Sequence, residues 1–277
     1  MRILAATDYS ENSKSAIKFA IQLAEQNPDV KVSFFHSLHI PQPTNLSDAD
    51  FAQFEIEKTE EGKQNLKLFI DDIYKSLNLV PKNNELVVIE SSIADGNIIN
   101  LAEKEKYDFI CIGARGAGKL EKFLGTNTVN IINKSKVPVL AIPINYTFGQ
   151  INKIMYASDF TDVDTELTKV LDFDKKLNAE IEIIHFAFPS ETAQKESQAL
   201  RIKQEYSQNI KVTVVDNNAL KPVVANINDY VTQHLPSLLV MFTDPNKSFI
   251  EKLIFSGNTE GMALKANVPL LVFKKAN

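Results

Sequence analysis

The chain has 277 residues, enough for two domains of ordinary size or one large domain. Hydrophobic residues make up 44% and charged residues 23%, which are typical of a globular protein and exclude a disordered one. The net charge is only −5 and is spread over both halves, so neither half has the basic excess of a nucleic-acid binder. No apolar run approaches the roughly 18 to 20 residues that cross a membrane. We therefore expect neither a nucleic-acid partner nor a membrane association.

The N-terminal residues enter a strand-like run directly and show no signal-peptide pattern. The single cysteine, Cys111, cannot form a disulfide within the chain, which suits a reducing compartment. It stands inside the apolar run "FICIG", where we expect a small buried hydrophobe rather than a reactive thiol. These features predict a cytoplasmic protein.

Strand-like and helix-like segments alternate along the first half. After the first apolar run, Ser10 can cap a helix whose apolar residues recur at spacings of three and four between Ala16 and Ala24. A longer, strongly charged helix is expected over 48–77, a third over 95–105 and a fourth from about Leu120 to Lys134. Short runs rich in β-branched and aromatic residues predict five strands that are covered on both faces. These strands span residues 2–7, 31–38, 85–90, 107–113 and 137–143.

The second half repeats the landmarks of the first in the same order. "MRILAATDYSENS" is echoed by "INKIMYASDFTDVD", and in each segment an apolar run ends in an aspartate, Asp8 or Asp159. "VKVSFFHSLHIP" is echoed by "AEIEIIHFAFP", with His36 and His185 in matching places. Each half also has an Asn-Thr pair at the same distance before a Val-Pro pair. The order of helices and strands repeats as well, with a shorter second helix.

This repetition predicts two tandem α/β domains, residues 1–146 and residues 151–277. Each is expected to contain an open, mostly parallel five-stranded sheet with helices on both faces. Ligands bind such sheets beyond the carboxyl ends of the strands, where the strand order reverses. Because Asp8 and Gly113 both follow predicted strands, we expect one rim to carry both and one ligand to reach both.

The segment "GARGAGKLEKFLGTNT", residues 113–128, combines glycines at a strand end with basic residues, as phosphate-binding loops do. It fits the P-loop pattern G-x-x-x-x-G-K-[ST] only in part, because Leu120 stands where the magnesium-binding hydroxyl belongs. It departs further from the dinucleotide pattern G-x-G-x-x-G, because Glu121 replaces the third glycine. A third pattern, with two glycines at the strand end and a second anchor at residues 125–127, fits better.

Tandem halves, Asp8 after the first strand, the turn of Gly113 and Gly116, the Gly125-Thr126 pair and a closing "VPVLAIP" strand occur together. In this combination the chain resembles the tandem form of the universal stress protein family, over nearly its whole length and more strongly in the first half. The fold so implied is Rossmann-like, of the adenine nucleotide alpha hydrolase-like type. Nucleotide-binding members carry Gly-x2-Gly-x9-Gly-[Ser/Thr]. Here eight residues separate Gly116 from Gly125, which a one-residue deletion near "AGK" explains.

The resemblance implies that the first domain binds ATP, or ADP or AMP in its place, with or without Mg²⁺. Asp8 would contact the ribose or adenine, and Ala6, Thr7 and Ser37 would line the base pocket. The expected nucleotide-binding residues are Ala6, Thr7, Asp8, Ser37, Ile112, Gly113, Gly116, Gly125, Thr126 and Asn127.

Physical chemistry supports the phosphate side of this site. Glycines at 113 and 116 let the backbone approach phosphates without Cβ collisions and with outward N–H groups. Gly125 and Thr126 border a helical turn whose N–H groups attract anions, and the Thr126 hydroxyl can add a hydrogen bond. Replacement of Gly113 or Gly125 by valine is therefore expected to block the phosphates.

The second half lacks the corresponding loop. Asp244 and Pro245 stand where the glycine turn belongs, and proline lacks an N–H donor while a carboxylate repels phosphate. Ser256-Gly257 replaces the Gly-Thr pair. Asp159 remains, and we interpret it as a cap of the following turn. We therefore expect at most one nucleotide per chain, with the second domain as a structural partner in an intrachain pseudo-dimer that, by resemblance, joins through the last strands.

The remaining residues do not predict a metal site or an active site. No His, Cys and Asp cluster has the spacing of a zinc site, and His36 and His185 suit partly buried, hydrogen-bonded imidazoles. No nucleophile or water-activating group stands out. We expect at most slow ATP hydrolysis, and no catalytic residues.

The leading hypothesis is a cytoplasmic, nucleotide-binding stress-response protein whose nucleotide-bound state is recognised by a protein partner. Two alternatives stay open at this point. The chain could be a nucleotide-free interaction module, if the shortened loop has lost binding, or an NTPase or kinase that uses the Gly113–Lys119 pattern. The sequence leaves open whether two chains form a further homodimer.

Overall fold

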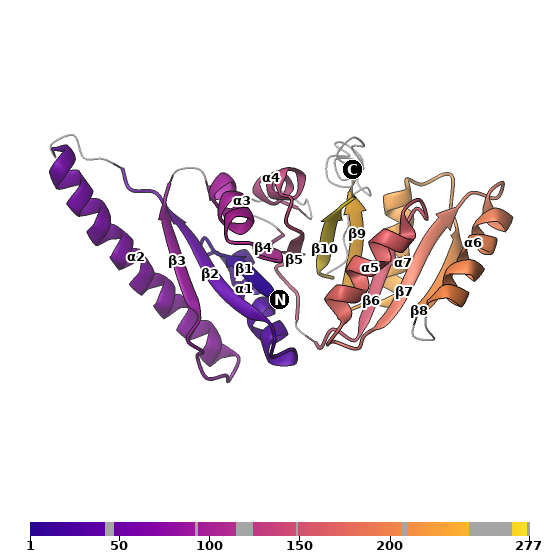
Figure 1. Ribbon diagram of the computed structural model, residues 1–277, viewed down its shortest axis with the longest axis horizontal. Helices are drawn as coiled ribbons and strands as arrows, with labels where there is room; N and C mark the ends of the chain where they lie inside the picture. The colour runs from indigo at the N-terminus through magenta and orange to yellow at the C-terminus, as the bar shows by residue number, and fades with distance from the viewer. Residues whose placement is uncertain are drawn as a thin grey trace. The chain divides into compact units, whose positions relative to one another are not determined.

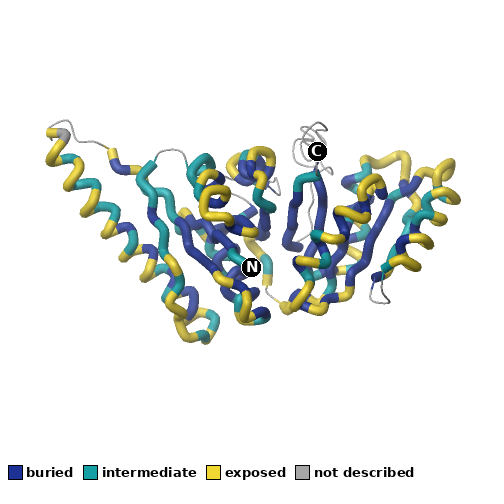
Figure 2. The backbone as a smooth tube through the Cα atoms, in the orientation of Figure 1, coloured by how far each residue is buried: buried dark blue, intermediate teal, exposed yellow. Residues whose placement is uncertain are grey.

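The computed structural model describes residues 1–41, 47–91, 94–114, 124–147, 149–206, 210–243 and 268–275. The chain divides into two compact units, and the main part of the second begins at Gly149. In both units the central strands are the most deeply buried elements, and the helices expose one side (Figure 2). None of the described helices is long and apolar enough to cross a membrane.

The first unit alternates strands with helices, as the sequence predicts (Figure 1). Its five described strands are all parallel and lie in the order β3-β2-β1-β4-β5. The elements are β1 (Arg2–Ala6), α1 (Glu11–Gln26), β2 (Lys31–Leu38), α2 (Asp48–Ser76), β3 (Glu85–Glu90), α3 (Ala94–Lys104), β4 (Phe109–Gly113), α4 (Thr126–Lys134) and β5 (Val139–Ile142).

The strand order places the switch point of this sheet between β1 and β4. The chain runs outward from β1 to β2 and β3, then returns to β4 on the other side of β1. Because such crossovers are right-handed, α1 and α2 cover one face and α3 and α4 the other. The contacts agree with this, since α1 packs against α2 and α3 against α4. The carboxyl ends of β1 and β4 therefore form the rim on which a ligand is expected.

Local sequence explains the helix that follows β1. The Ser10 side chain accepts a hydrogen bond from the Ser13 N–H and caps α1, as predicted. The predicted apolar stripe is buried at Ala16, Ile17, Ala20 and Leu23. Cys111 in β4 is also fully buried, and burial raises the pKa of its thiol, so the expectation of an unreactive core residue is confirmed.

The second unit repeats this arrangement, which confirms the predicted class of two parallel α/β sheets. Its five described strands lie in the order β10-β9-β6-β7-β8 and are parallel, so the switch point falls between β6 and β9. The elements are β6 (Lys153–Ala157), α5 (Val163–Asp174), β7 (Glu180–Ala187), α6 (Thr192–Glu205), β8 (Ile210–Asp216), α7 (Val223–His234), β9 (Leu238–Thr243) and β10 (Leu270–Lys274).

A buried carboxylate stabilises the outer part of this second sheet. Glu182 in β7 has no solvent exposure, and its carboxylate lies 2.8 Å from the ammonium of Lys211. The hydroxyls of Tyr230 and Thr213 each donate to it at 3.0 Å. Burial alone would raise the pKa of Glu182, but these donors lower it from 4.5 to about 2.

This carboxylate predicts an acid-sensitive contribution to stability. Because its pKa is lower in the folded protein, the contribution is present above about pH 5 and is lost as the pH falls toward about 2. Because the Lys211 side chain is half exposed, we expect this carboxylate to add about 2 kcal/mol to the free energy of unfolding, which is less than the full pKa shift would give. Urea unfolding of Glu182→Gln should show a correspondingly weaker acid dependence, whereas Glu180→Gln, at an exposed position of the same strand, should behave like wild type. If the free energy of unfolding depended on pH equally in the two variants, Glu182 would not be the acid-sensitive group.

Candidate functional site

The chain turns sharply after β1, directly beside the switch point of the first sheet. Tyr9 adopts a left-handed backbone conformation with φ of 64°, which is uncommon for a non-glycine residue. Its N–H donates to the Thr7 hydroxyl at 2.9 Å, and the ring of His36 lies against its own ring with centroids 4.3 Å apart. His36 Nδ1 is 2.9 Å from the Thr7 carbonyl oxygen, so this imidazole donates to the turn. The turn is thus built by side chains that the strands β1 and β2 bring together.

Asp8 lies at the top of this turn and is exposed to solvent. Its Oδ1 accepts hydrogen bonds from the Ser10 N–H at 3.0 Å and the Ser10 hydroxyl at 2.5 Å. Partial burial alone would raise the pKa of Asp8, but these hydrogen bonds outweigh it and hold the pKa below its usual range. Asp8 is therefore an ionised acceptor at the rim, and it forms no ion pair with a described residue.

The residues expected around the base form the floor of the rim. Ala6 and Ile112 are buried neighbours on β1 and β4, because the paired register brings Ala5 beside Cys111. The Thr7 hydroxyl forms a hydrogen bond with the Ser13 hydroxyl at 2.9 Å, so the Thr7 side chain already contributes to the turn. Ser37, at the end of β2, donates its hydroxyl to the Ser91 carbonyl oxygen at 3.2 Å. Gly116 lies outside the described residues.

For Gly113 the structure gives a packing reason for the glycine, besides the predicted approach of a phosphate. A Cβ at this position would lie 2.6 Å from the carbonyl oxygen of Asn12 and 3.1 Å from the N–H nitrogen of Ser13. The absent side chain therefore makes room for the first turn of α1. A valine at 113 would collide with this backbone, so its effect could not be assigned to phosphate blocking.

The start of α4 contributes the remaining predicted residues. Gly125 caps the helix, but its N–H donates to the Ala114 carbonyl oxygen at 2.7 Å and is not available to a ligand. Thr126 and Asn127 are exposed in the first turn, where backbone N–H groups have no acceptor within the helix. The Thr128 hydroxyl donates to the Gly113 carbonyl oxygen at 3.0 Å and ties this helix end to β4. Asp8, the Ala6–Ile112 floor and this helix end thus lie around the same switch point.

Comparisons with known proteins agree with this geometry. The family model described as the universal stress protein family matches residues 1–143, more than half of the chain. The chain belongs to the universal stress protein family. A curated universal stress protein of Helicobacter pylori (strain ATCC 700392 / 26695) is 27% identical over 143 residues, covering 50% of this chain and 98% of the relative. One of Methanocaldococcus jannaschii is 28% identical over 157 residues, covering 51% and 93%.

A solved structure extends the similarity of fold to the whole chain. The universal stress protein from Archaeoglobus fulgidus DSM 4304 covers 99% of this chain and 98% of its own, with a TM-score of 0.69 and 20% sequence identity. At that identity the likeness concerns the fold alone. It agrees with two units of universal stress protein fold in one chain.

The second unit rebuilds the same turn with different residues. Phe160 has φ of 62°, its N–H donates to the Ser158 hydroxyl at 3.1 Å, and its ring stacks on His185 with centroids 4.5 Å apart. His185 Nδ1 lies 2.8 Å from the Ser158 carbonyl oxygen. Asp159 accepts a hydrogen bond from the Thr161 N–H at 2.9 Å, as the predicted cap. The aspartate and histidine therefore serve the turn in both units and do not by themselves distinguish a binding rim from a structural one.

The two rims differ at the end of the fourth strand. In the first sheet, Phe109 pairs with Ile3, and Gly113 follows Phe109 by four residues. In the second sheet, Leu238 pairs with Ile154, the repeat counterpart of Ile3, and Phe242 follows Leu238 by four residues. Phe242 therefore occupies the register position of Gly113. Its ring stacks on Phe273 with centroids 5.0 Å apart. A large side chain thus lies at the register position where the first unit has a glycine packed against the first turn of α1.

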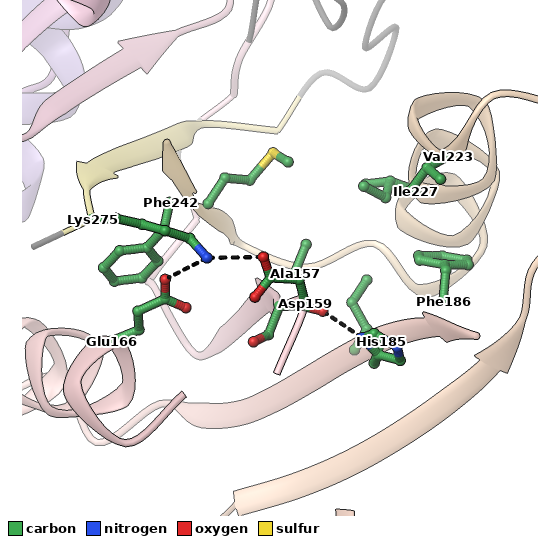
Figure 3. Close-up of a pocket in the computed structure, with 12 residues that line it drawn as sticks. Ala157, Asp159, Glu166, His185, Phe186, Val223, Ile227, Phe242 and Lys275 are labelled. Carbon is green, nitrogen blue, oxygen red and sulfur yellow. Dashed lines mark hydrogen bonds and ion pairs between the residues drawn. The ribbon is translucent and has the colours of Figure 1, made fainter. Parts of the chain in front are cut away.

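A cavity of about 290 Å³ opens at this rim of the second unit (Figure 3). The sequence did not predict this cavity. The missing glycine loop of the second half concerns only the side of the rim where phosphates would bind. The cavity's lining includes the register counterparts of six predicted site residues of the first unit: Ala157 for Ala6, Ser158 for Thr7, Asp159 for Asp8, Phe186 for Ser37, Met241 for Ile112 and Phe242 for Gly113.

Lys275 closes one side of this cavity and was also missed. Figure 3 shows its ammonium between Asp159, at 2.8 Å, and Glu166, at 3.3 Å. Burial alone would raise the pKa of Asp159, but the ammonium lowers it. Burial raises the pKa of Glu166 more than its partners lower it. The only sequence signal was that Lys275 follows the last strand where the first half has Ile144.

Other predictions for this unit cannot be compared with the structure. Asp244, Pro245, Ser256 and Gly257 lie outside the described residues. Within the described ranges, no group of three or more His, Cys, Asp or Glu side chains could hold a metal ion.

Proposed function

We propose that the first unit binds ATP or a related adenine nucleotide at the rim between β1 and β4. The observation that carries the proposal is the grouping of Asp8, the Ala6–Ile112 floor and the α4 N-terminus at one switch point, within the region that matches the family model. This is the place where open α/β sheets bind their ligands.

The residues present fit such a ligand. Ala6 and Ile112 offer an apolar floor for a base. Asp8 is ionised and exposed, so it can accept hydrogen bonds from ribose hydroxyls. The first turn of α4, at Thr126 and Asn127, presents unpaired N–H groups and the positive end of the helix dipole to phosphates. Since the Gly125 N–H is engaged by Ala114, phosphate contacts fall to these later residues.

The proposal extends to what the chain does with a bound nucleotide. Among the described residues near it, none combines a nucleophile or general base with a position opposite the phosphates, so the unit acts by binding and at most hydrolyses ATP slowly. Nucleotide binding stabilises one conformation, which a protein partner recognises in a cytoplasmic stress response. The second unit carries no ATP in this proposal.

A charge placed at the start of α4 tests the site without disturbing the fold. Thr126→Glu puts a carboxylate in the first turn, where it favours the helix dipole yet repels phosphate. We expect ATP affinity to fall by about tenfold or more in isothermal titration calorimetry, with stability unchanged or slightly raised. Thr192→Glu is the matched control, because Thr192 begins α6 in the second unit. It should leave ATP affinity at the wild-type value.

The same titration separates the alternatives. Absence of ATP, ADP and AMP binding in wild type would leave a nucleotide-free interaction module. Equal affinities for Thr126→Glu and wild type would show that the nucleotide binds elsewhere. Turnover of ATP that disappears in Lys119→Ala, with binding retained, would favour the NTPase instead.

A further inference from the structure

The longest helix of the first unit, α2, is packed against the sheet along only part of its length. In its C-terminal half, Leu66 and Ile70 are almost completely buried. In its N-terminal half, Phe51 and Phe54 are only half-buried, and Ile56 is 64% exposed. Figure 1 shows these first turns diverging from β3, the strand that α2 contacts. The described part of this unit therefore leaves apolar side chains of α2 partly uncovered.

A cavity of about 300 Å³ lies beside the N-terminal half of α2, and we call it the α2 groove. Leu38, Ile40 and Pro41, at the end of β2 and in the chain that follows, line one side, and Phe54 and Gly62 of α2 line the other. None of the predicted nucleotide-binding residues is among its lining residues. Its volume is at the lower limit of pockets that enclose a whole small molecule, and it suits one or two apolar side chains of a partner.

Acidic side chains border the α2 groove. Spacings of seven and four residues place Asp50, Glu57 and Glu61 on one stripe of the helix. Lys58 is the only lysine or arginine among the lining residues, and Glu61 pairs with it at 2.7 Å. Asp50 and Glu57 accept hydrogen bonds from a hydroxyl and an amide, so no described cation neutralises them. Residues 50–63 include five acidic residues and two lysines, which favours a cationic partner.

These charges oppose three other occupants of the groove. The phosphates of a nucleic acid or of an anionic membrane surface would be repelled by the acidic stripe. A second copy of this chain, bound through the same face, would bring two acidic helices together. The charges therefore favour a different protein that supplies basic residues.

We infer that the α2 groove binds a basic, amphipathic segment of a protein partner. A large apolar side chain of that segment packs beside Phe54, and its lysine or arginine side chains lie against the acidic stripe. Insertion of apolar anchors from a short segment into a groove is a common mode of protein recognition. The inference identifies a surface for the protein partner of the proposed function, but it does not depend on nucleotide binding.

A displayed library of random dodecapeptides tests this inference on the full chain in the absence of ATP. Asn65→Trp should block the groove, because Asn65 is exposed, lines the groove and lies one turn after Glu61, and a helical side chain covers the preceding turn. Gln64→Trp is the matched control, since Gln64 is also exposed but lies outside the lining. Peptides enriched on wild type should combine a large apolar residue with several Lys or Arg residues. They should bind Gln64→Trp as they bind wild type, and Asn65→Trp at least about tenfold more weakly.

Charge reversal tests the acidic stripe separately. Glu61→Lys should weaken binding of an enriched peptide by about fivefold in fluorescence polarisation, because it replaces an attraction with a repulsion. Asp72→Lys is the matched control, since Asp72 is an exposed acid of the same helix three turns further on. It should leave the affinity at the wild-type value. An increase in ionic strength from about 0.05 M to about 0.5 M should also weaken binding to wild type.

Three results would overturn the inference. These are no peptide that prefers wild type to Asn65→Trp, enriched peptides without an excess of Lys and Arg, and equal affinities of Glu61→Lys and wild type. Self-association of the full chain in analytical ultracentrifugation that disappears in Asn65→Trp would instead show a second copy in the groove. Failure of ATP to bind the first unit would refute the proposed function and leave the peptide results unaffected.

Discussion

Gly113→Ala should destabilise the first unit by about 2 to 3 kcal/mol, although a glycine-to-alanine change usually stabilises a chain by restricting its unfolded state. The added Cβ would lie 2.6 Å from the carbonyl oxygen and 2.7 Å from the carbonyl carbon of Asn12. These are backbone atoms in the first turn of α1, so they cannot rotate away as a flexible side chain could. Either α1 shifts or β4 does, and both are packed against the core.

Urea unfolding followed by circular dichroism would measure this loss, and hydrogen exchange would locate it in α1 and β4. Gly149→Ala is the matched control, because nothing lies within 4 Å of the added Cβ there. We expect that control to change stability by less than about 0.5 kcal/mol. Equal stability of wild type and Gly113→Ala would show that α1 accommodates the methyl group and that packing does not explain the glycine.

Lys275→Met should destabilise the second unit by about 2 to 3 kcal/mol at neutral pH. The substitution leaves Glu166, whose side chain is 4% exposed, and Asp159 without their shared ammonium. Removal of one partner of a buried ion pair costs about 3 to 5 kcal/mol, and we reduce this because the Asp159 side chain is 53% exposed.

The pH dependence gives this prediction a second measurement. The pKa of Glu166 is already raised by burial, and loss of Lys275 raises it further. A carboxyl with a raised pKa in the folded state contributes most below about pH 4.5 and loses that contribution as the pH rises. The variant should therefore be closer to wild type at about pH 5 than at about pH 8. Lys275→Arg should retain the stability, and a Lys275→Met, Glu166→Gln double variant should recover part of it. A pH-independent loss would contradict the ion-pair explanation.

These two variants also affect how binding experiments are interpreted. Gly113 supports α1, so weakened ATP binding in a Gly113 variant would reflect misfolding as readily as a blocked phosphate site. Thr126 is exposed at a helix start, and a change there alters charge without removing a packed group. The nucleotide site is therefore better tested at Thr126.

Duplication has produced two rims with the same turn and different chemistry. Both units use an imidazole hydrogen-bonded to a carbonyl and an aspartate that caps the next residues. Beyond that turn, Asp8 of the first unit forms no ion pair with a described residue, whereas Asp159 of the second pairs with Lys275. The shared turn explains why the repeat is visible in sequence, and the different surroundings explain why the two units need not bind the same ligand.

The parallel α/β class, the duplication and the order of the elements could all be predicted from the amino-acid sequence alone. Short runs such as "FICIG" are typical of strands buried on both faces, and the length and charge of residues 48–77 predicted a long helix there. The Ser10 cap and the burial of Cys111 followed from local chemistry, which does not depend on distant parts of the chain.

The contacts of Gly113, His185 and Lys275 could be found in the folded structure and not in the sequence. Gly113 meets Asn12, about one hundred positions earlier, and Lys275 meets Asp159 across a similar separation. Parallel sheets join strands through long crossovers, so the residues around a switch point come from segments far apart in the chain. No local pattern encodes such a meeting. For that reason the cavity in the second unit was not predictable, even though most of its strands were.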